Sequence, residues 1–367
     1  MDPRVREHAE IIVEHSTDIE PGDDVVIDAN PVAEDLVVAL HEAVADAGAT
    51  ALAVQERFGK RFRRAYLRSH DGEFTERDFP DHVLALYEAM DVYVGVRSAD
   101  NATETSDVPP ETTRAYDQLT QPLLEERLDK TWCLTQYPSA AFAQLAEMST
   151  EAYEDFVWDA VNRDWGAQRD HQERMVEVLD PASEVRIRSG ETTDVTMRLD
   201  GMATINDYGE ANLPGGEVFT APVVDSVAGE VLFDKPVYQQ GREITDVRLV
   251  FEAGEVVEHE AAKNEAVLTE ILNTDEGARR LGELGIGMNR SIDRFTYNML
   301  FDEKMGDTVH MAVGRAYDEC VGEGNERNDS AVHVDMIVDM SEDSTIEVDG
   351  EVVQRDGTFR FEDGFEA

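Results

Sequence analysis

Apolar residues in the first half of the chain alternate between helical spacing and short continuous runs. Val5, Ala9 and Ile12 recur at the three- and four-residue spacing of an amphipathic helix. Four short apolar runs predict strands, at 24–29, 49–54, 91–96 and 131–136. Between the first two runs, residues 30–48 have a helical pattern that begins with Asn30 as a capping residue. This β-α-β order predicts a mostly parallel sheet with helices on both faces.

The pattern changes in the second half of the chain. Polar and apolar residues alternate singly in 185–201, as in antiparallel strands that are joined by a tight turn. Three further elements are predicted in this half, namely helices near 263–281 and 294–304 and a hairpin at 346–354. We therefore expect an N-terminal α/β domain in 1–180 and a C-terminal α+β domain, rich in antiparallel strands, in 181–367.

One strand of the second half carries an unusual polar pair. In "AVHVDMIVDM" (331–340), valines and methionine alternate along one face, and His333 and Asp335 begin the other. Burying an imidazole beside a carboxylate costs free energy unless a partner satisfies both groups. The pair is a hydrogen-bonded core pair, a catalytic dyad, or two ligands of a metal ion.

Three other stretches place single chemical groups among glycines and aliphatic residues. Glu217 leads the apolar strand of "NLPGGEVFTAP", and Glu283 lies within "LGELGIGMN". His310 and Tyr317 both belong to "HMAVGRAY", where a helix would put them on one face. Taken singly, each carboxylate could be a solvated strand position and each histidine a satisfied core residue. The glycines of "GELGIG" are not in the order of a dinucleotide-binding loop, and the chain has no G-x-S-x-G nucleophile elbow.

Together these stretches supply two histidines and three carboxylates, with a tyrosine nearby. Nitrogen and oxygen donors of this kind suit two divalent cations such as Zn, Co or Mn. A carboxylate that bridges two such ions is the usual arrangement for hydrolysis of peptides and phosphate esters. We therefore expect the C-terminal domain to be the metal-binding, catalytic domain, although the spacing does not say which carboxylate bridges.

The charge of the chain indicates its solvent and excludes one class of partner. The sequence has 80 acidic and 32 basic residues, a formal net charge of -48, and only five of the basic residues are lysine. The acidic residues are dispersed over the whole chain, which is typical of proteins from a salt-rich cytoplasm. Nucleic-acid binding is not expected because it requires clustered Lys and Arg, and no apolar run is long enough for a membrane span. The two cysteines, Cys133 and Cys320, form no metal or redox motif, which suits a reducing cytoplasm.

The four stretches that carry these residues resemble, in order, the motifs of the thermophilic-type aminopeptidases of peptidase family M29. "GDDVVIDA" and "TWCLTQYPS" extend the resemblance into the first half of the chain. The resemblance implies a family of metallo-exopeptidases that form homodimers and act on peptides, and the dispersed acidic charge indicates a member from a halophilic archaeon. It implies the following metal ligands: Glu217, Glu283, His310, Tyr317, His333 and Asp335.

The resemblance also implies that Glu283 and Tyr317 take part in catalysis. We expect an aminopeptidase that removes N-terminal residues from peptides with a water activated by two metal ions. The alternative is a non-enzymatic metal-binding protein, in which the histidines and carboxylates form a closed structural site. A phosphoesterase would need basic residues near the metals to hold phosphate, and the motifs offer only Arg290 and Arg315.

Overall fold

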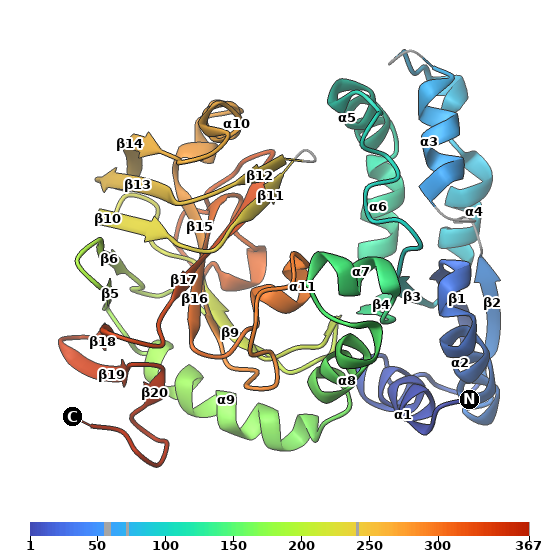
Figure 1. The fold of residues 1–367 in the computed structure, drawn as a ribbon, viewed down its shortest axis with the longest axis horizontal. Coiled ribbons are helices and arrows are strands. Elements are labelled where there is room, and N and C mark those ends of the chain that lie inside the picture. The colour runs from blue at the N-terminus through green and yellow to red at the C-terminus, as the bar shows by residue number, and fades with distance from the viewer. Residues whose placement is uncertain (55–59, 71–72, 240–241, 367) are drawn as a thin grey trace. The chain divides into compact units, whose positions relative to one another are not determined.

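The chain forms two compact units in a computed structural model that describes residues 1–367 apart from 55–59, 71–72, 240–241 and 367 (Figure 1). The first unit comprises Met1–Arg163 and Gly209–Pro214, and the second comprises Asp164–Tyr208 and Gly215–Ala367. Among the described residues, none of the helices has both the length and the apolar character needed to cross a bilayer.

The boundary between the units lies one helix earlier than the boundary expected at residue 180. Helix α9 (Trp165–Leu179) belongs to the second unit. Gln168 Nε2 donates a hydrogen bond to the Met288 carbonyl at 3.2 Å, and Gln172 Nε2 donates to the Glu217 carbonyl at 2.8 Å. These buried glutamines interrupt the apolar face of α9, so the helix has no clear hydrophobic period in the sequence.

The first unit contains a five-stranded parallel sheet in the order β2-β1-β3-β4-β8. Its strands are β1 (Asp24–Ala29), β2 (Thr50–Val54), β3 (Val92–Arg97), β4 (Thr131–Gln136) and β8 (Asn212–Leu213). Successive residues Val25, Val26 and Ile27 of β1 are all buried, so both faces of the sheet are covered. The prediction of a parallel sheet covered on both faces is confirmed.

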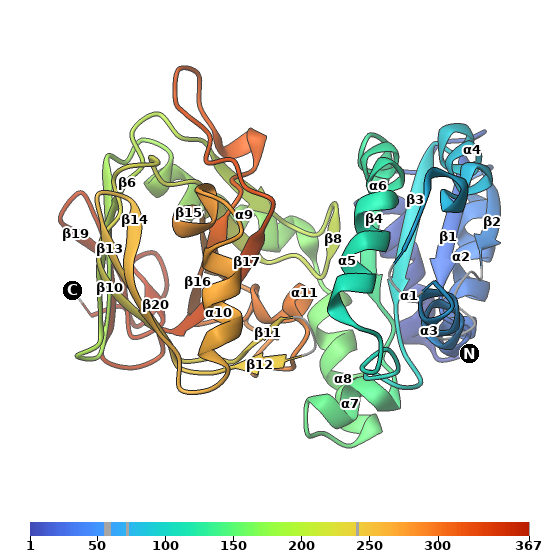
Figure 2. The same cartoon turned by 90° about the horizontal axis from the view of Figure 1, so that it is seen from above.

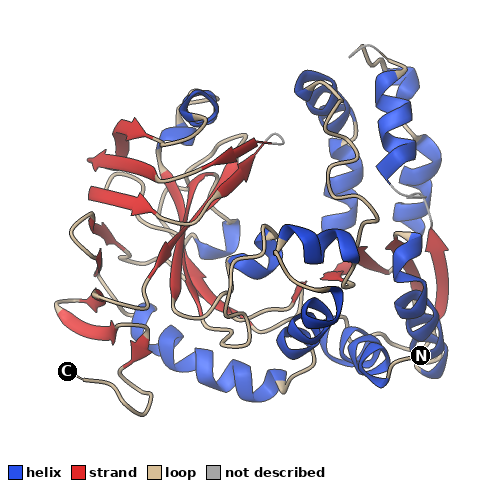
Figure 3. Cartoon of the chain, viewed as in Figure 1, coloured by secondary structure: helices blue, strands red, loops and turns tan. Residues whose placement is uncertain are grey.

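Eight α-helices surround this sheet in the described part of the first unit (Figure 3). They are α1 (Pro3–Ile11), α2 (Glu34–Asp46), α3 (Lys60–Arg68), α4 (Asp81–Ala89), α5 (Pro110–Leu119), α6 (Gln121–Leu128), α7 (Ala140–Leu145) and α8 (Thr150–Val161). Asn30 caps the turn that leads into α2, since its side chain accepts a hydrogen bond from the Val32 amide at 3.0 Å.

The second unit is built from two antiparallel sheets and a two-stranded ribbon (Figures 1 and 2). The larger sheet contains, in order, β14 (Glu255–Glu260), β13 (Val247–Glu252), β10 (Ala228–Phe233), β6 (Thr193–Arg198), β5 (Glu184–Ser189), β18 (Ser344–Val348), β19 (Glu351–Arg355) and β20 (Thr358–Phe359). The smaller contains β17 (His333–Asp339), β16 (Thr308–Gly314), β15 (Leu281–Gly287), β9 (Glu217–Thr220) and β7 (Thr204–Asp207). The ribbon pairs β11 (Val237–Gln239) with β12 (Arg242–Ile244).

Two of the elements predicted in this half are shorter than expected, and the third is confirmed. The helices are α10 (Glu265–Leu272) and α11 (Met299–Asp302), each much shorter than its predicted range. The hairpin is formed by β18 and β19. Its turn residues Asp349 and Gly350 have φ angles of 49° and 82°, the left-handed conformation that a two-residue hairpin turn of this type requires.

The smaller sheet has one apolar face and one polar face. Val309, Met311 and Val313 of β16 belong to the main hydrophobic core, as do Val334 and Met336 of β17. Because side chains alternate along a strand, the intervening residues of β16 and β17 lie on the opposite face. The strands that carry the polar side chains are therefore held in place by the apolar side chains on their other face, which pack in the core.

A glycine makes room for an imidazole on the polar face. Gly285 of β15 pairs with His310 of β16 in the strand register. A Cβ atom at Gly285 would lie 2.0 Å from His310 Nε2, closer than any non-bonded contact allows. The glycines of "GELGIG" are thus explained by close packing of strands and side chains, not by a nucleotide-binding loop.

We predict that Gly285→Ala destabilises the second unit, because the added methyl group would force the buried His310 ring to move. Overpacking of this kind costs about 1–3 kcal/mol. Thermal or urea unfolding measures the loss. Gly166→Ala is the matched control, since a Cβ there meets only the Asp164 side chain at 3.2 Å. Equal stabilities of Gly285→Ala and the control would contradict the prediction.

Candidate metal centre

The strand register of the smaller sheet brings together five of the six predicted site residues. Glu283, Ala312 and Asp335 are aligned across β15, β16 and β17. His310 and His333 lie on the same face as these carboxylates, and Glu217 reaches the group from the start of β9. Ala312 is the small residue that lies between the two carboxylates in the strand register, and it is buried.

His310 lies between two carboxylates. Its Nε2 atom is 3.1 Å from Glu217 Oε2 and 3.1 Å from Glu283 Oε1. All three side chains are buried. A single nitrogen that faces two carboxylate oxygens must share a cation with them, either a proton or a metal ion.

His333 has the geometry of a metal ligand, because a hydrogen bond from Nδ1 leaves Nε2 of the neutral ring free of a proton and directed at the carboxylates. Its Nδ1 atom lies 2.8 Å from the Arg315 carbonyl, which can only accept a hydrogen bond, so Nδ1 carries the proton. The other nitrogen, Nε2, is 3.3 Å from Asp335 Oδ1 and 3.5 Å from Glu283 Oε2. A backbone acceptor on the far nitrogen is the usual way in which proteins orient a metal-binding histidine.

These contacts divide the residues into two groups that share Glu283. One group is Glu217, Glu283 and His310, and the other is Glu283, His333 and Asp335. Within each group the potential ligand atoms lie within 4.8 Å of one another. Glu283 directs Oε1 toward His310 and Oε2 toward His333, so one carboxylate connects both groups.

The close packing of charges shifts the pKa values at the site in opposite directions. Burial raises the pKa of Glu283, and the nearby Asp335 carboxylate raises it further. Burial would also raise the pKa of Glu217, but Lys304 and His310 outweigh this effect and hold it below its usual value. Burial disfavours the imidazolium form of His310, yet Glu217 and Glu283 keep its pKa well above the usual value. The site therefore attracts positive charge strongly.

The residues present fit a pair of divalent cations. Glu217 Oε2 and Glu283 Oε2 are buried and receive no well-formed hydrogen bond from the described residues. Each faces an imidazole nitrogen, His310 Nε2 at 3.1 Å and His333 Nε2 at 3.5 Å. A buried carboxylate oxygen without a donor is costly, and a metal ion between the carboxylates and the histidines would remove that cost. The ligand set of imidazole nitrogens and carboxylate oxygens is the one that Zn, Co and Mn use.

Tyr317 lies beside the site, but the helix that the sequence suggested for 310–317 does not form. The segment is strand β16 up to Gly314, and Tyr317 follows in a loop that precedes a short 3₁₀ turn. The Tyr317 ring packs 5.0 Å from the His333 ring and 5.9 Å from Phe219, measured between ring centroids. The protein around the hydroxyl and the Glu283 and Asp335 carboxylates raise the pKa of this phenol, so it stays protonated.

Lys304 is a site residue that the sequence analysis did not single out. Its side chain is fully buried, and its Nζ lies 2.9 Å from Glu217 Oε1. Lys304 also forms ion pairs with Glu303 and with Asp207. The only available signal was its rarity, because it is one of five lysines in 367 residues.

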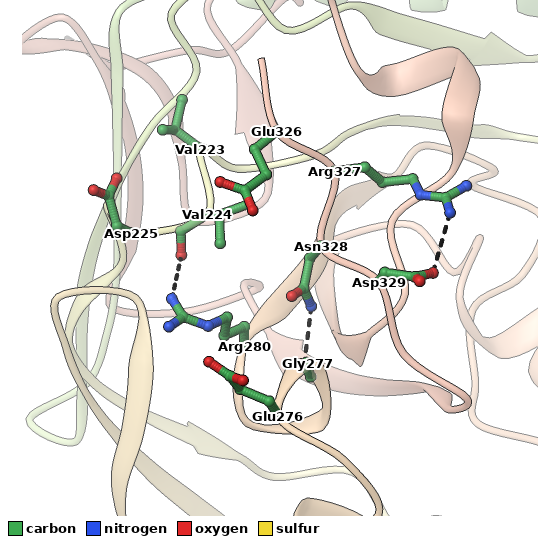
Figure 4. Close-up of a pocket in the computed structure, with 10 residues that line it drawn as sticks. All are labelled: Val223, Val224, Asp225, Glu276, Gly277, Arg280, Glu326, Arg327, Asn328 and Asp329. Atoms are coloured by element: carbon green, nitrogen blue, oxygen red, sulfur yellow. Dashed lines mark hydrogen bonds and ion pairs between the residues drawn. The ribbon is translucent and has the colours of Figure 1, made fainter.

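A separate polar pocket of about 470 Å³ lies elsewhere in the second unit (Figure 4). Its lining consists of Val223, Val224, Asp225, Glu276, Gly277, Arg280, Glu326, Arg327, Asn328 and Asp329. Within the lining, Arg327 pairs with Asp329 at 3.1 Å, Asn328 donates to the Gly277 carbonyl at 2.9 Å, and Arg280 donates to the Val224 carbonyl at 3.4 Å. None of the six predicted site residues belongs to this lining, so the pocket is not the metal centre.

Solved structures with the same fold include two enzymes with different names. AmpT from Thermus thermophilus has a TM-score of 0.85 at 24% identity, with 98% of this chain and 99% of that chain covered. A 2,5-dihydroxypyridine dioxygenase from Pseudomonas putida has a TM-score of 0.59 at 15% identity, with 98% and 97% covered. At these identities the likeness establishes the fold, which alone does not decide the reaction.

Sequence comparison identifies the family. Aminopeptidase 2 of Geobacillus stearothermophilus is 29% identical over 275 residues, which cover 63% of this chain and 65% of that protein. Aminopeptidase AmpS of Bacillus subtilis is 32% identical over 267 residues, which cover 63% of each protein. The match thus spans just under two thirds of the length of these relatives. The family profile described as "Thermophilic metalloprotease (M29)" matches residues 1–360, and the chain belongs to this family.

Proposed function

We propose that this protein is an aminopeptidase that removes N-terminal residues from peptides with two divalent metal ions. The observation that carries the proposal is the pair of ligand groups that share Glu283 on one face of the smaller sheet. One ion would be held by Glu217, Glu283 and His310, and the other by Glu283, His333 and Asp335. Membership of a metalloprotease family and the names of the relatives support the same conclusion.

The uneven exposure of the ligands favours catalysis over a closed structural site. The side chains of Glu217, Glu283 and His310 are 7%, 6% and 1% exposed. Those of His333 and Asp335 are 21% and 14% exposed. A structural metal site is closed by its protein ligands, whereas a catalytic site keeps one side open for water and substrate. The open side here is the one formed by His333, Asp335 and Tyr317.

The two oxygens of Glu283 favour a bridging role for this carboxylate. Because they face different histidines, Glu283 is better placed to connect the two ions than to accept a proton as a general base. Two cations bound at the site would polarise the scissile carbonyl group and lower the pKa of an attacking water. Which of Zn, Co and Mn is the native metal is left to direct metal analysis of the purified protein.

Tyr317 is proposed to act on the reacting carbonyl and not to anchor a metal. Its phenol is protonated at neutral pH and lies on the open side of the site, next to His333. A neutral hydroxyl group is a poor metal ligand but a good hydrogen-bond donor to an oxyanion that develops in the transition state. Packing against Phe219 and His333 would hold the ring in position for this role.

The setting of the enzyme is proposed on the basis of charge and family. A net charge of -48 suits the cytoplasm of a halophilic archaeon, in which molar salt screens the repulsion between carboxylates. The scarcity of cysteine agrees with a reducing compartment. Peptides are the proposed partners, and a homodimer is proposed from the family resemblance alone.

We predict that metal-free protein is inactive on an amino-acid anilide and that two equivalents of added Zn, Co or Mn restore hydrolysis. The N-acetylated anilide should not be cleaved, since an aminopeptidase requires a free amino terminus. His333→Ala should lose metal and activity but keep its fold, because the apolar face of β17 is unchanged.

The matched control is His259→Ala, which removes another strand histidine of the second unit, one that is bonded to Thr269 at 2.8 Å. This control should retain both ions and full activity. A His333→Ala protein that binds two ions and turns over like the wild type would refute the assignment of the site.

We predict that Tyr317→Phe binds metal almost normally and loses most of its kcat with little change in KM. Removal of one oxyanion donor typically lowers kcat by about 10²–10³-fold. Tyr238→Phe is the control, because Tyr238 is also about half exposed in the same unit but is not part of the site. Loss of metal from Tyr317→Phe would make the phenol a ligand, and an unchanged kcat would leave it only a packing role.

We predict that the unfolding midpoint rises steeply between about 0.1 and 3 M KCl, because salt shortens the Debye length to ~3 Å at 1 M. Acidic residues outnumber basic ones by 80 to 32, so screening weakens repulsion within the acidic surface more than it weakens the exposed ion pairs. Sucrose at matched osmolality is the control, since it changes hydration without screening charge. Full stability in dilute buffer would rule out the halophilic interpretation.

A further inference from the structure

Lys304 is a buried ammonium group that is surrounded by carboxylates. Its side chain is fully buried, and three carboxylates surround its Nζ atom. Glu217 Oε1 lies at 2.9 Å, Asp207 Oδ2 lies at 3.6 Å, and Glu303 Oε1 is in direct contact. Because its side chain is 0% exposed, Lys304 cannot reach a substrate. Any effect of Lys304 on the reaction must therefore act through these carboxylates.

The two carboxylate oxygens of Glu217 face different partners, one toward Lys304 and the other toward the candidate metal centre. Its Oε1 atom faces Lys304, whereas its Oε2 atom lies 3.1 Å from His310 Nε2. Lys304 is the described cation that holds Oε1, so without it the carboxylate could turn. With Lys304 in place, only Oε2 is presented to the group formed with Glu283 and His310.

Hydrogen bonds of Asn289 fix the position of the Lys304 backbone relative to the turn before Glu217. The Asn289 amide donates a hydrogen bond to the Lys304 carbonyl at 3.1 Å. The Asn289 side chain donates to the Gly215 carbonyl at 3.1 Å, two residues before Glu217. A Cβ on Gly216 would lie 2.4 Å from Asn289 Cβ, so this turn packs directly on Asn289. One residue thus connects the backbone at Lys304 with the turn that leads into Glu217.

We propose that Lys304 is a positioning residue that makes Glu217 a single-oxygen ligand of the ion shared with Glu283 and His310. Its charge also compensates Asp207 and Glu303, so that these carboxylates do not draw the ion away from its place. The inference rests on the proposed two-metal function. It predicts an effect confined to one of the two ions.

The test is a calorimetric titration of metal-free protein with Zn²⁺, which requires no catalytic turnover. Lys304→Met should weaken one of the two binding steps by about 10–100-fold, the usual effect of losing a group that orients a metal ligand. The step assigned to Glu283, His333 and Asp335 should stay within about threefold of the wild type, since none of these residues contacts Lys304. This selectivity separates positioning from a general loss of structure.

Lys235→Met is the matched control. Lys235 forms an ion pair with Asp339 at 2.8 Å, at the end of β17 in the same unit, and contacts none of the proposed ligands. The control removes one lysine charge from the same unit, as Lys304→Met does, but should leave both Zn²⁺ affinities unchanged. If the two lysine variants weaken binding equally, the loss is a general charge effect and the inference is overturned.

A second variant covers the case in which Lys304→Met does not fold. The double variant Lys304→Met/Glu303→Gln removes one positive and one negative charge, so the buried cluster keeps its net charge while Glu217 still loses its partner. It should show the same weakening of one Zn²⁺ step. Two wild-type affinities in either folded variant, or failure of both variants to fold, would overturn the positioning role. A wild-type protein that binds fewer than two Zn²⁺ ions would instead overturn the proposed function.

Discussion

The arrangement of the second unit depends on the need to bury several carboxylates close together. Glu217, Glu283 and Asp335 converge on one sheet face with little access to water, and Asp207 and Glu303 lie next to Glu217 around Lys304. Buried carboxylates repel one another and stay ionised only if cations accompany them. Histidines, one lysine and the proposed metal ions are the cations available to this chain. The positions of these groups follow from that requirement.

The two faces of the smaller sheet have different roles: one packs in the hydrophobic core and the other carries the charged groups. Alternate residues of β16 and β17 enter the hydrophobic core and hold the strands in register, so the chemical groups on the other face need contribute nothing to packing. Small residues at Ala312 and Gly285 leave the space that the carboxylates and the His310 ring occupy. The precision of the site therefore comes from strand register, which is more rigid than a loop.

Two kinds of apolar spacing, continuous runs in the first half and period-two alternation in the second, explain why much of this could be predicted from the sequence. The parallel first sheet, the antiparallel second half and the shared face of His333 and Asp335 all follow from the spacing of apolar residues. Tyr317 could not be placed in this way, since His310 and Tyr317 fit a helix as well as a strand followed by a loop. Helix α9 was missed because Gln168 and Gln172 are buried where an apolar residue would be expected, and their hydrogen bonds to β9 and Met288 are long-range. Pairing of a lysine with distant carboxylates leaves no local pattern at all.

Carboxylates need accompanying cations both on the surface and in the interior of this protein. Lysine is nearly absent from the chain, and those lysines whose contacts are described mostly engage carboxylates, as Lys235 does with Asp339 and Lys263 with Glu243. Mobile salt cations can replace a lysine on the surface, where they screen carboxylates without a fixed position. They cannot do so beside Glu217, because a mobile cation in that position would compete with the divalent ions for the same oxygens. A covalently attached ammonium group neutralises Asp207 and Glu303 but cannot move into the metal centre. In the proposed two-metal site, Lys304 therefore balances the negative charge beside Glu217 without occupying a metal position.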